Sequence, residues 1–205
     1  MTQRPFIYVL AGVNGSGKSS VGGALIREEG LDWFNPDELT RQLKADGLSP
    51  GDANAQAWHT GKRLLEEAIA QGRNHAFETT LGGNTITRLL RQACASHDVI
   101  VWYIGLESVE LNLERIRERV KRGGHDIPAH KVVERYEKSP LNLITLLKDA
   151  ARIEIHDNSA SVAAGGTVAG ARLLAAIKWG ELVEPRDVRE LAALPGWVQP
   201  IIGAL

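Results

Sequence analysis

Short apolar runs alternate along the chain with longer segments in which apolar residues recur every three or four positions. Such runs are typical of buried strands, and the periodic segments are typical of amphipathic helices. The expected strands are residues 6–10, 31–34, 75–80, 99–104, 152–156 and 173–179. The run 99–104 is apolar throughout, which predicts a parallel strand covered on both faces. Because strands and helices alternate, we expect an α/β fold with a doubly wound, mostly parallel sheet and helices on both faces.

Helix start and stop signals divide the remaining segments. The expected helices are 18–29, 37–45, 55–70, one from residue 84, one from residue 108, one after residue 128, 141–150, and a capping helix after Pro185. The segment 47–54 is rich in Gly, Pro, Ser and Asp, which predicts a loop before the third helix. In that helix Trp58, Leu65 and Ile69 share one face, and Gly72 closes it.

The helix from Ser108 has apolar residues at spacings of four, three and four, and basic residues on its other face. The apolar residues are Val109, Leu113, Ile116 and Val120, and the basic ones are Arg115, Arg119 and Arg122. Gly123 and Gly124 end this helix, and Ser139-Pro140 predicts an N-cap and first-turn proline that open a further helix. We expect these segments to form a helical hairpin, or lid, over the sheet.

Residues 12–19 read Gly-Val-Asn-Gly-Ser-Gly-Lys-Ser and match G-x-x-x-x-G-K-[ST] directly after the first expected strand. In this phosphate loop the glycines let the backbone curl around an anion, and the next helix points its N–H groups at phosphates. The predicted residues that bind the cofactor ATP are Gly12, Asn14, Gly15, Ser16, Gly17, Lys18, Ser19 and Ser20. We expect Lys18 to reach the β- and γ-phosphates and the Ser19 hydroxyl to bind Mg²⁺.

Two carboxylates lie at expected strand ends, Asp37 after 31–34 and Glu78 within 75–80. Ligands bind at this edge of an open α/β sheet, so both are candidates for placing an acceptor hydroxyl. Asp37 alternatively supplies a favourable charge to a first helical turn, and Glu78 alternatively caps a glycine turn. Thr79 and Thr80 either hydrogen-bond the substrate or only stabilise the turn.

Several motifs together resemble the zeta toxin family. They are Gly12 to Ser19, Asn35-Pro36-Asp37-Glu38, Phe77-Glu78-Thr79-Thr80, Arg122 to Pro128, and Arg135-Tyr136 with Ser139. Members are P-loop kinases, and the well-known ones phosphorylate the sugar hydroxyl of UDP-N-acetylglucosamine. The resemblance implies that Asp37 receives the proton of the attacking hydroxyl, that Glu78 is a substrate-side or metal-side carboxylate, and that lid arginines clamp phosphate. It also implies an antitoxin protein as a possible partner.

The lid arginines have a simpler alternative, since Glu118 and Arg122 stand at the i,i+4 spacing of a solvated salt bridge. One of Arg119, Arg122 and Arg135 is expected to contact phosphate, with Arg122 and Arg135 the first choices. His125 is expected in a turn or against the substrate. Asn158 borders the adenine or belongs to a strand-end turn.

Composition narrows the functional class. The 205 residues are 43% hydrophobic and contain no linker-like tract, so we expect a single domain over residues 1–205. The net charge of -1 and pI of about 6.6 give no reason to expect nucleic acid or an anionic membrane as partner. The lone Cys94 cannot form an internal disulfide and fits the cytoplasm. No signal peptide is evident, and residues 6–10 are too short to span a bilayer.

Three functions fit these observations. The first is an Mg-ATP-dependent kinase that phosphorylates a hydroxyl of a nucleotide sugar such as UDP-N-acetylglucosamine. The second is a P-loop kinase for another small hydroxyl acceptor, namely a sugar, an antibiotic or a nucleoside. The third is an ATP-binding regulatory module without chemistry of its own. Carboxylates at consecutive strand ends favour the kinases, because a switch needs no carboxylate on the acceptor side.

Overall fold

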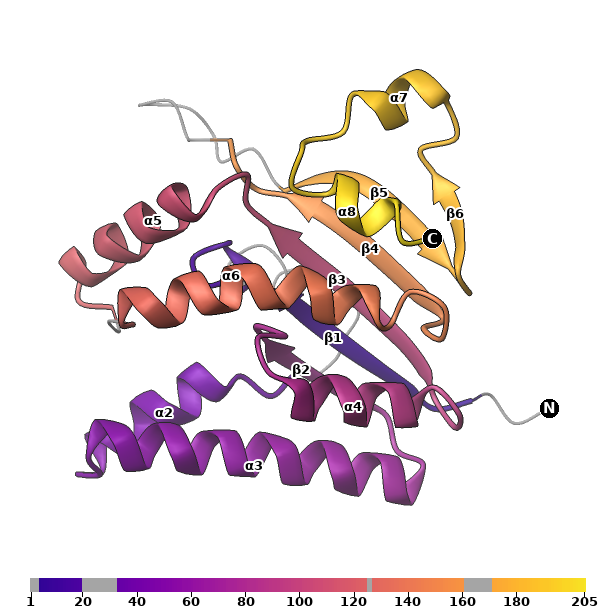
Figure 1. Ribbon diagram of the computed structural model, residues 1–205. Coiled ribbons are helices and arrows are strands. Elements are labelled where there is room, and N and C mark those ends of the chain that lie inside the picture. The colour runs from indigo at the N-terminus through magenta and orange to yellow at the C-terminus, as the bar shows by residue number, and fades with distance from the viewer. Residues whose placement is uncertain (1–3, 20–32, 125–126, 161–170) are drawn as a thin grey trace.

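The computed structural model describes residues 4–19, 33–124, 127–160 and 171–205. Within these residues a six-stranded sheet has the order β2-β1-β3-β4-β5-β6 (Figure 1). The strands are β1 (Phe6–Gly12), β2 (His75–Thr79), β3 (Asp98–Gly105), β4 (Arg152–Asp157), β5 (Arg172–Lys178) and β6 (Glu181–Glu184). The first four strands in this order pair in parallel, and β5 and β6 are antiparallel. The α/β class with a mostly parallel sheet is therefore confirmed.

Of the strand expected at 31–34, the described residues contribute one bridge. Phe34 pairs in parallel with Phe77, its N–H donates to the Ala76 carbonyl at 2.8 Å, and its own carbonyl accepts from the Glu78 N–H at 3.0 Å. A helix starts at Pro36, so the chain leaves the sheet edge immediately, and residues 31 and 32 lie outside the described residues. The bridge still fixes Glu78 beside the start of that helix.

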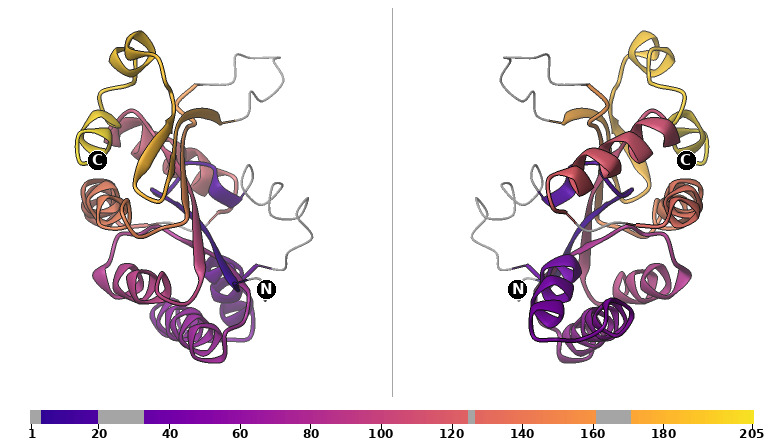
Figure 2. Two further views of the ribbon diagram at one scale, coloured as in Figure 1. Left: turned by 90° about the vertical axis from the view of Figure 1, so that its right-hand side faces the viewer. Right: turned by 90° about the vertical axis from the view of Figure 1, so that its left-hand side faces the viewer.

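One face of the sheet carries the main core. Figure 2 shows α4, α6 and α8 on the same side of the strands, and their apolar residues pack with those of β1, β3 and β4. On the opposite face β3 presents Ile100 and Trp102, which are only partly buried, and Ile104, which is buried beside Leu10. The expected burial on both faces is therefore met only at the carboxyl end of the strand. The helix expected at 18–29 falls almost wholly outside the described residues.

The described helices are α2 (Pro36–Ala45), α3 (Pro50–Gln71), α4 (Asn84–Ala93), α5 (Val109–Lys121), α6 (Ala129–Ile144), α7 (Val188–Ala192) and α8 (Gln199–Ile202). Side-chain caps start α2, α3, α5 and α7. The Ser108 hydroxyl accepts from the Leu111 N–H at 3.2 Å, as expected for an N-cap, and Gly72 ends α3 in the left-handed region. The predicted 47–54 loop is too long, because Ser49 caps α3 and Pro50 occupies its first turn.

Two further expectations about helices are wrong. Ser139-Pro140 does not start a new helix, because α6 continues through it to Ile144. The buried Ser139 hydroxyl accepts from the Tyr103 hydroxyl at 3.0 Å, which ties this part of α6 to β3, and Pro140 removes only one helical hydrogen bond. Trp58 does not share the burial of Leu65, since 43% of its surface is exposed.

The α5–α6 pair forms the expected hairpin, but the two helices differ in position. Helix α6 covers the sheet, whereas α5 stands beyond the carboxyl end of β3 (Figure 1). Asn112 and Ile116 are its buried residues, and Val120 of the expected apolar stripe is exposed. Residue 112 approaches Gly15, so α5 packs against the phosphate loop instead of lying flat on the sheet.

Candidate active site

The phosphate loop takes a backbone path that requires glycine. Gly12 has a φ of 138°, and a side chain there would collide with the carbonyl of Ile104 on the neighbouring strand β3. Gly15 and Gly17 have φ values of 70° and 86°, which are also in the left-handed region. The loop therefore curls as the motif predicts, directly at the end of the buried strand β1.

Lys18 is folded into this loop. Its Nζ donates to the Val13 carbonyl at 2.9 Å and lies 3.8 Å from Glu78 Oε1, with only 6% of the side chain exposed. Burial lowers the pKa of Lys18, and the Glu78 carboxylate opposes that shift. The ammonium group is thus positioned before any ligand arrives.

Glu78 joins three elements. Its Oε2 accepts from the Ser19 hydroxyl at 2.8 Å and from Asn35 Nδ2 at 3.2 Å, and the side chain is 8% exposed. Burial raises the pKa of Glu78, while Lys18 and the Ser19 hydrogen bond lower it. The sequence left Glu78 either on the substrate side or on the metal side, and it lies against the serine expected to bind metal.

These oxygen atoms suit Mg²⁺, which prefers hard ligands and keeps several waters. Among the described residues no cluster of three or more His, Cys, Asp or Glu side chains could hold a metal ion. A magnesium ion at Ser19 and Glu78 would therefore complete its coordination with phosphate oxygens and water. Ser20, also predicted for the phosphate loop, lies outside the described residues.

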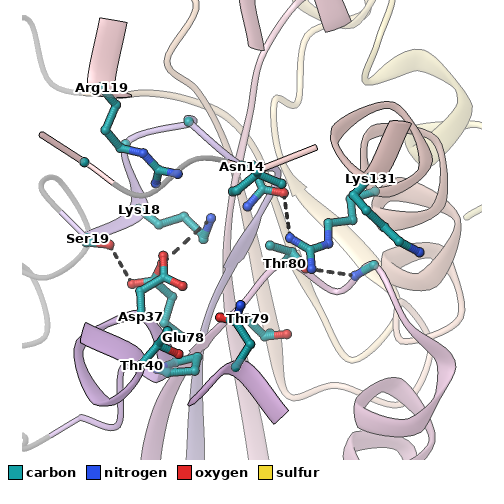
Figure 3. Close-up of a pocket in the computed structure, with 18 of the residues that line it drawn as sticks. Asn14, Lys18, Ser19, Asp37, Thr40, Glu78, Thr79, Thr80, Arg119 and Lys131 are labelled. Carbon is teal, nitrogen blue, oxygen red and sulfur yellow. Dashed lines mark hydrogen bonds and ion pairs between the residues drawn. The ribbon is translucent and has the colours of Figure 1, made fainter. Parts of the chain in front are cut away.

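Asp37 lies in the first turn of α2, exposed to the same pocket. Asn35 caps this helix, because its Oδ1 accepts from the Asp37 N–H at 2.9 Å. The Nδ2 of the same Asn35 holds Glu78, so one side chain fixes the spacing of the two carboxylates. Figure 3 shows Asp37, Glu78, Lys18 and Ser19 at one end of the pocket.

The pocket has a volume of about 1400 Å³ and is walled by the phosphate loop, α2, α3, the end of β2, the start of α4, α5 and α6. It brings together most of the residues predicted from sequence: Asn14, Gly15, Gly17, Lys18, Ser19, Asp37, Glu78, Thr79, Thr80, Arg122, Arg135 and Asn158. Gly12 and Ser16 shape the loop without lining the pocket. His125 lies outside the described residues.

The hydroxyls of the two threonines support the turn that follows β2. Thr79 Oγ1 accepts from the Leu81 N–H at 3.1 Å, and Thr80 Oγ1 accepts from the Gly82 N–H at 3.4 Å. The turn alternative is therefore realised, and each hydroxyl still has an O–H to donate into the pocket.

Arg135 of α6 reaches the phosphate loop directly. Its NH1 donates to Asn14 Oδ1 at 3.2 Å, and its side chain passes over Gly82, where an added Cβ would lie 2.7 Å from Arg135 Cγ. Arg122 caps the end of α5 and also lines the pocket. Glu118 forms its ion pair with Lys121, at 2.6 Å, and not with Arg122 as the spacing suggested.

Arg115 and Arg119 also line the pocket, and Figure 3 shows the Arg119 side chain directed into it. The sequence interpretation placed Arg115 on a solvated face. Its NH2 instead donates to the carbonyls of Ser159 and Ala160, at 3.4 and 3.3 Å, beside Gly15. Residues 115, 119 and 122 share one helical face, a signal that was visible in the sequence.

Asn158 connects the end of β4 to the phosphate loop. Its Nδ2 donates to the Ser16 carbonyl at 2.8 Å, and its own N–H donates to the Gly105 carbonyl at 3.2 Å. Asn158 therefore belongs to a strand-end turn that also lines the pocket, so both sequence alternatives are compatible with its position.

The sheet order, the phosphate loop and the helices around the pocket define a P-loop kinase-like α/β domain. Residues 7–139 match the family model described as an AAA domain, and the chain belongs to that family. In the described part of the chain, no helix has both the length and the apolar character needed to cross a membrane.

Two curated relatives match part of the chain. An uncharacterised protein of Haemophilus influenzae is 34% identical over 133 residues, which are 61% of this chain and 88% of that protein. A shikimate kinase of Corynebacterium efficiens is 35% identical over 96 residues, 46% of this chain and 56% of the kinase. The match thus spans little more than half of the shikimate kinase.

Solved structures share the fold at low identity. AvrRxo1-ORF1 in complex with AvrRxo1-ORF2 and ATP has a TM-score of 0.65 at 16% identity, over 95% of this chain and 65% of that one. A putative kinase from Chloroflexus aurantiacus has a TM-score of 0.54 at 18% identity, over 67% of this chain and 79% of that one. At such identities the similarity concerns the fold alone.

Proposed function

We propose that this protein is an Mg-ATP-dependent phosphotransferase that moves the γ-phosphoryl group of ATP to a hydroxyl of a small molecule. The observation that carries the proposal is the placement of Asp37 in the same pocket as Lys18 and the phosphate loop. A pocket with phosphate-binding groups at one end and an exposed carboxylate beside them suits transfer to a hydroxyl. The similarity to a shikimate kinase supports this class of reaction.

Each residue has a part in this reaction. The loop N–H groups and Lys18 hold the phosphates, and Ser19 with Glu78 would hold Mg²⁺, which neutralises charge between the β- and γ-phosphates when bound. Asp37 orients the acceptor hydroxyl and takes its proton. Arg122 and Arg135 meet the charge that spreads over the γ-phosphoryl oxygens.

For the acceptor we propose a nucleotide sugar such as UDP-N-acetylglucosamine, on the resemblance to zeta toxins. Another sugar, an antibiotic or a nucleoside is the alternative, and the shikimate kinase relative supports a small acceptor of that kind. The resemblance to zeta toxins is also the ground for proposing an antitoxin partner. The lone Cys94 is the ground for proposing a cytoplasmic location. A regulatory ATP-binding module without transfer is the competing function.

The test is a screen of purified protein with labelled ATP and Mg²⁺ against UDP-sugars, free sugars and nucleosides. We expect transfer to one of these acceptors, and faster ATP consumption in its presence because the acceptor completes the site and excludes water. Asp37→Asn keeps the shape of the side chain but cannot take the proton, so transfer should fall by about 10²- to 10⁴-fold while ATP still binds.

Asp46→Asn is the matched control, because Asp46 caps the far end of α2 and does not line the pocket. Equal ATP consumption with and without every acceptor would favour the regulatory module. Wild-type transfer in Asp37→Asn would place the base elsewhere, with Glu78 next to test.

A further inference from the structure

One wall of the pocket is a face of α3 that the phosphoryl-transfer residues do not use. Asn54, Trp58 and Lys62 line the pocket at i, i+4 and i+8, the spacing of a single helical face. Ala57 and Gly61 line it on the same face and bring the helix backbone close. Trp58 is thus the one bulky apolar side chain that α3 offers to the pocket among these positions.

Trp58 is not part of the core. Its side chain is 43% exposed, although Ala57 beside it and Leu65 two turns later are fully buried. The indole makes an edge contact with His59, with ring centroids 4.9 Å apart and planes at 79°. A large aromatic ring that remains exposed inside a concave site is typical of a surface that buries its apolar area against a ligand.

Helix α3 packs on the segment that leads into α2 and Asp37. A Cβ at Gly61, one turn from Trp58, would lie 2.6 Å from the Phe34 ring, so the absence of a side chain lets Phe34 pack on the helix. Phe34 and Phe77 line the pocket and pair through the bridge that precedes α2. Phe34, Trp58 and Phe77 therefore form an aromatic wall of the pocket. Phe34 in this wall precedes the proposed base Asp37 by three residues.

Charge on this wall is already compensated. Lys62 Nζ lies 2.7 Å from Glu66 Oε1 in an i,i+4 pair on α3. Recognition at this face therefore depends on apolar contact more than on ion pairing. This contrasts with the α5 side, where Arg115, Arg119 and Arg122 line the pocket.

The pocket also has room for two ligands. Its volume of about 1400 Å³ is larger than the roughly 300–1,000 Å³ usual for one small-molecule site. A nucleotide on the phosphate loop therefore leaves space along α3. The free volume is bounded by the aromatic wall.

We infer that Trp58 is a stacking platform for the acceptor, and that the acceptor carries a flat-faced ring, either a nucleobase or a pyranose. Both kinds of ring bury a face against an indole, whereas an open-chain polyol offers no such face. The inference rests on the proposed function, because it concerns the acceptor of the same site. It adds the requirement that a ring, and not only a hydroxyl, is recognised.

The test measures binding without turnover. Isothermal titration calorimetry is run with a non-hydrolysable ATP analogue and Mg²⁺ present, using UDP-N-acetylglucosamine, uridine, N-acetylglucosamine and ribitol as probes. Wild type is compared with Trp58→Ala, Trp58→Phe and Trp179→Ala. Trp179 is the matched control, because it is also an exposed tryptophan, at 57%, and does not line the pocket.

We expect Trp58→Ala to weaken the dissociation constant of a ring-bearing probe by about tenfold to a hundredfold, the usual loss of one stacking contact. Trp58→Phe should stay within a few-fold of wild type, and Trp179→Ala should match it. Uridine and N-acetylglucosamine separate the two sources of the ring. Ribitol should bind no more weakly to Trp58→Ala than to wild type.

Equal binding of the ring probes to wild type and Trp58→Ala overturns the inference, and so does the absence of binding by every ring probe to wild type. If ring probes bind in a Trp58-dependent way but the protein transfers no phosphate, the proposed function is wrong and this inference is supported. Transfer to an acceptor with the same kinetics in wild type and Trp58→Ala supports the proposed function and overturns this inference.

Discussion

Lys18 and Glu78 form an ion pair that the fold keeps out of water. Burial raises the pKa of Glu78 and lowers that of Lys18, so each charge is less favourable here than in solution. Their separation of 3.8 Å recovers part of that cost. Phosphate would add a negative charge near Lys18, and Mg²⁺ a positive charge near Glu78. Without ligands, the ion pair recovers only part of the cost of burying these two charges. Phosphate and Mg²⁺ would recover more of it.

This electrostatic balance predicts a pH dependence of stability. A raised pKa means that folded Glu78 keeps its proton over a range above the usual 4.5, in which the unfolded chain has lost it. The free energy of unfolding contributed by Glu78 therefore falls as pH rises from about 4.5 through its folded pKa, and then levels off. Glu78→Gln removes this dependence. Urea unfolding between pH 4.5 and 7.5 measures the free energy of unfolding of both proteins. As pH rises, wild type should lose stability relative to Glu78→Gln.

Glu67→Gln is the control for that series, because Glu67 pairs with Arg63 on an exposed face of α3. The difference in free energy of unfolding between Glu67→Gln and wild type should not change with pH in the way expected for Glu78→Gln. A wild-type advantage over Glu78→Gln that stays constant across the range would contradict the assignment of a raised pKa to Glu78.

The candidate site was predictable where one short motif specifies the chemistry. Lys18 and Ser19 follow from the phosphate loop, and Asp37 and Glu78 follow from their places at strand ends. Trp58 and Arg115 were misplaced for one reason. An amphipathic pattern shows which residues share a face, but not whether that face meets the core or a pocket.

At the scale of elements, α5 and α6 deliver arginines to the pocket from two directions. Helix α6 packs on the sheet and holds Arg135 against Asn14. Helix α5 stands beside the phosphate loop and presents Arg122 at its end. Sequence predicted the two helices but not their different placement, because a periodic segment does not specify its neighbours. The continuous α6 was missed because a proline usually marks a helix boundary.

The arginines on these helices should affect turnover more than ATP affinity. Arg135→Ala and Arg122→Ala remove positive charge that meets the transition state, so turnover with the true acceptor should fall by up to about 10³-fold. We expect the larger loss at Arg135, whose guanidinium already lies at the phosphate loop. Steady-state kinetics with varied ATP separate the two effects.

Arg117→Ala is the control for the arginine series, since Arg117 is exposed on α5 and does not line the pocket. Arg115 is unsuitable as a control because of its contacts beside Gly15. Normal turnover in both Arg122→Ala and Arg135→Ala would mean that these arginines have no part in transfer and only form a solvated helix face.

At the scale of the molecule, the sheet continues past the residues matched by the family. Strands β4, β5 and β6 extend the sheet that starts with β1 to β3, and we propose that residues 1–205 fold as one domain on this basis. The strand at 99–104 was predictable as an apolar run and the strand at 152–156 from two isoleucines that alternate with polar residues, whereas β6, Glu-Leu-Val-Glu, carries too few apolar residues to be recognised.

The carboxyl-terminal segment contacts the strand ends next to the site. The Trp197 ring packs directly on Gly105 at the end of β3, where any side chain would collide with it. Its Nε1 donates to Asp157 Oδ1 at 3.3 Å, and the next residue, Asn158, donates to the Ser16 carbonyl. A tryptophan beyond the family match thus supports the strand-end turn that holds the phosphate loop.

Trp197→Phe tests this connection, because it keeps an aromatic ring but removes the N–H donor, together with the outer indole atoms that pack on Gly105. We expect the dissociation constant for ATP to rise by about three- to tenfold, the effect of one hydrogen bond worth about 0.5–1.5 kcal/mol. The melting temperature should fall less than in Trp197→Ala, because part of the packed ring remains. Trp197→Ala should instead destabilise the protein by up to about 3–5 kcal/mol, because it removes a large ring that packs against the core. Trp179→Phe, on the exposed turn after β5, should change neither quantity. Unchanged ATP affinity in Trp197→Phe would mean that Trp197 contributes packing alone and that Asn158 holds the phosphate loop without it.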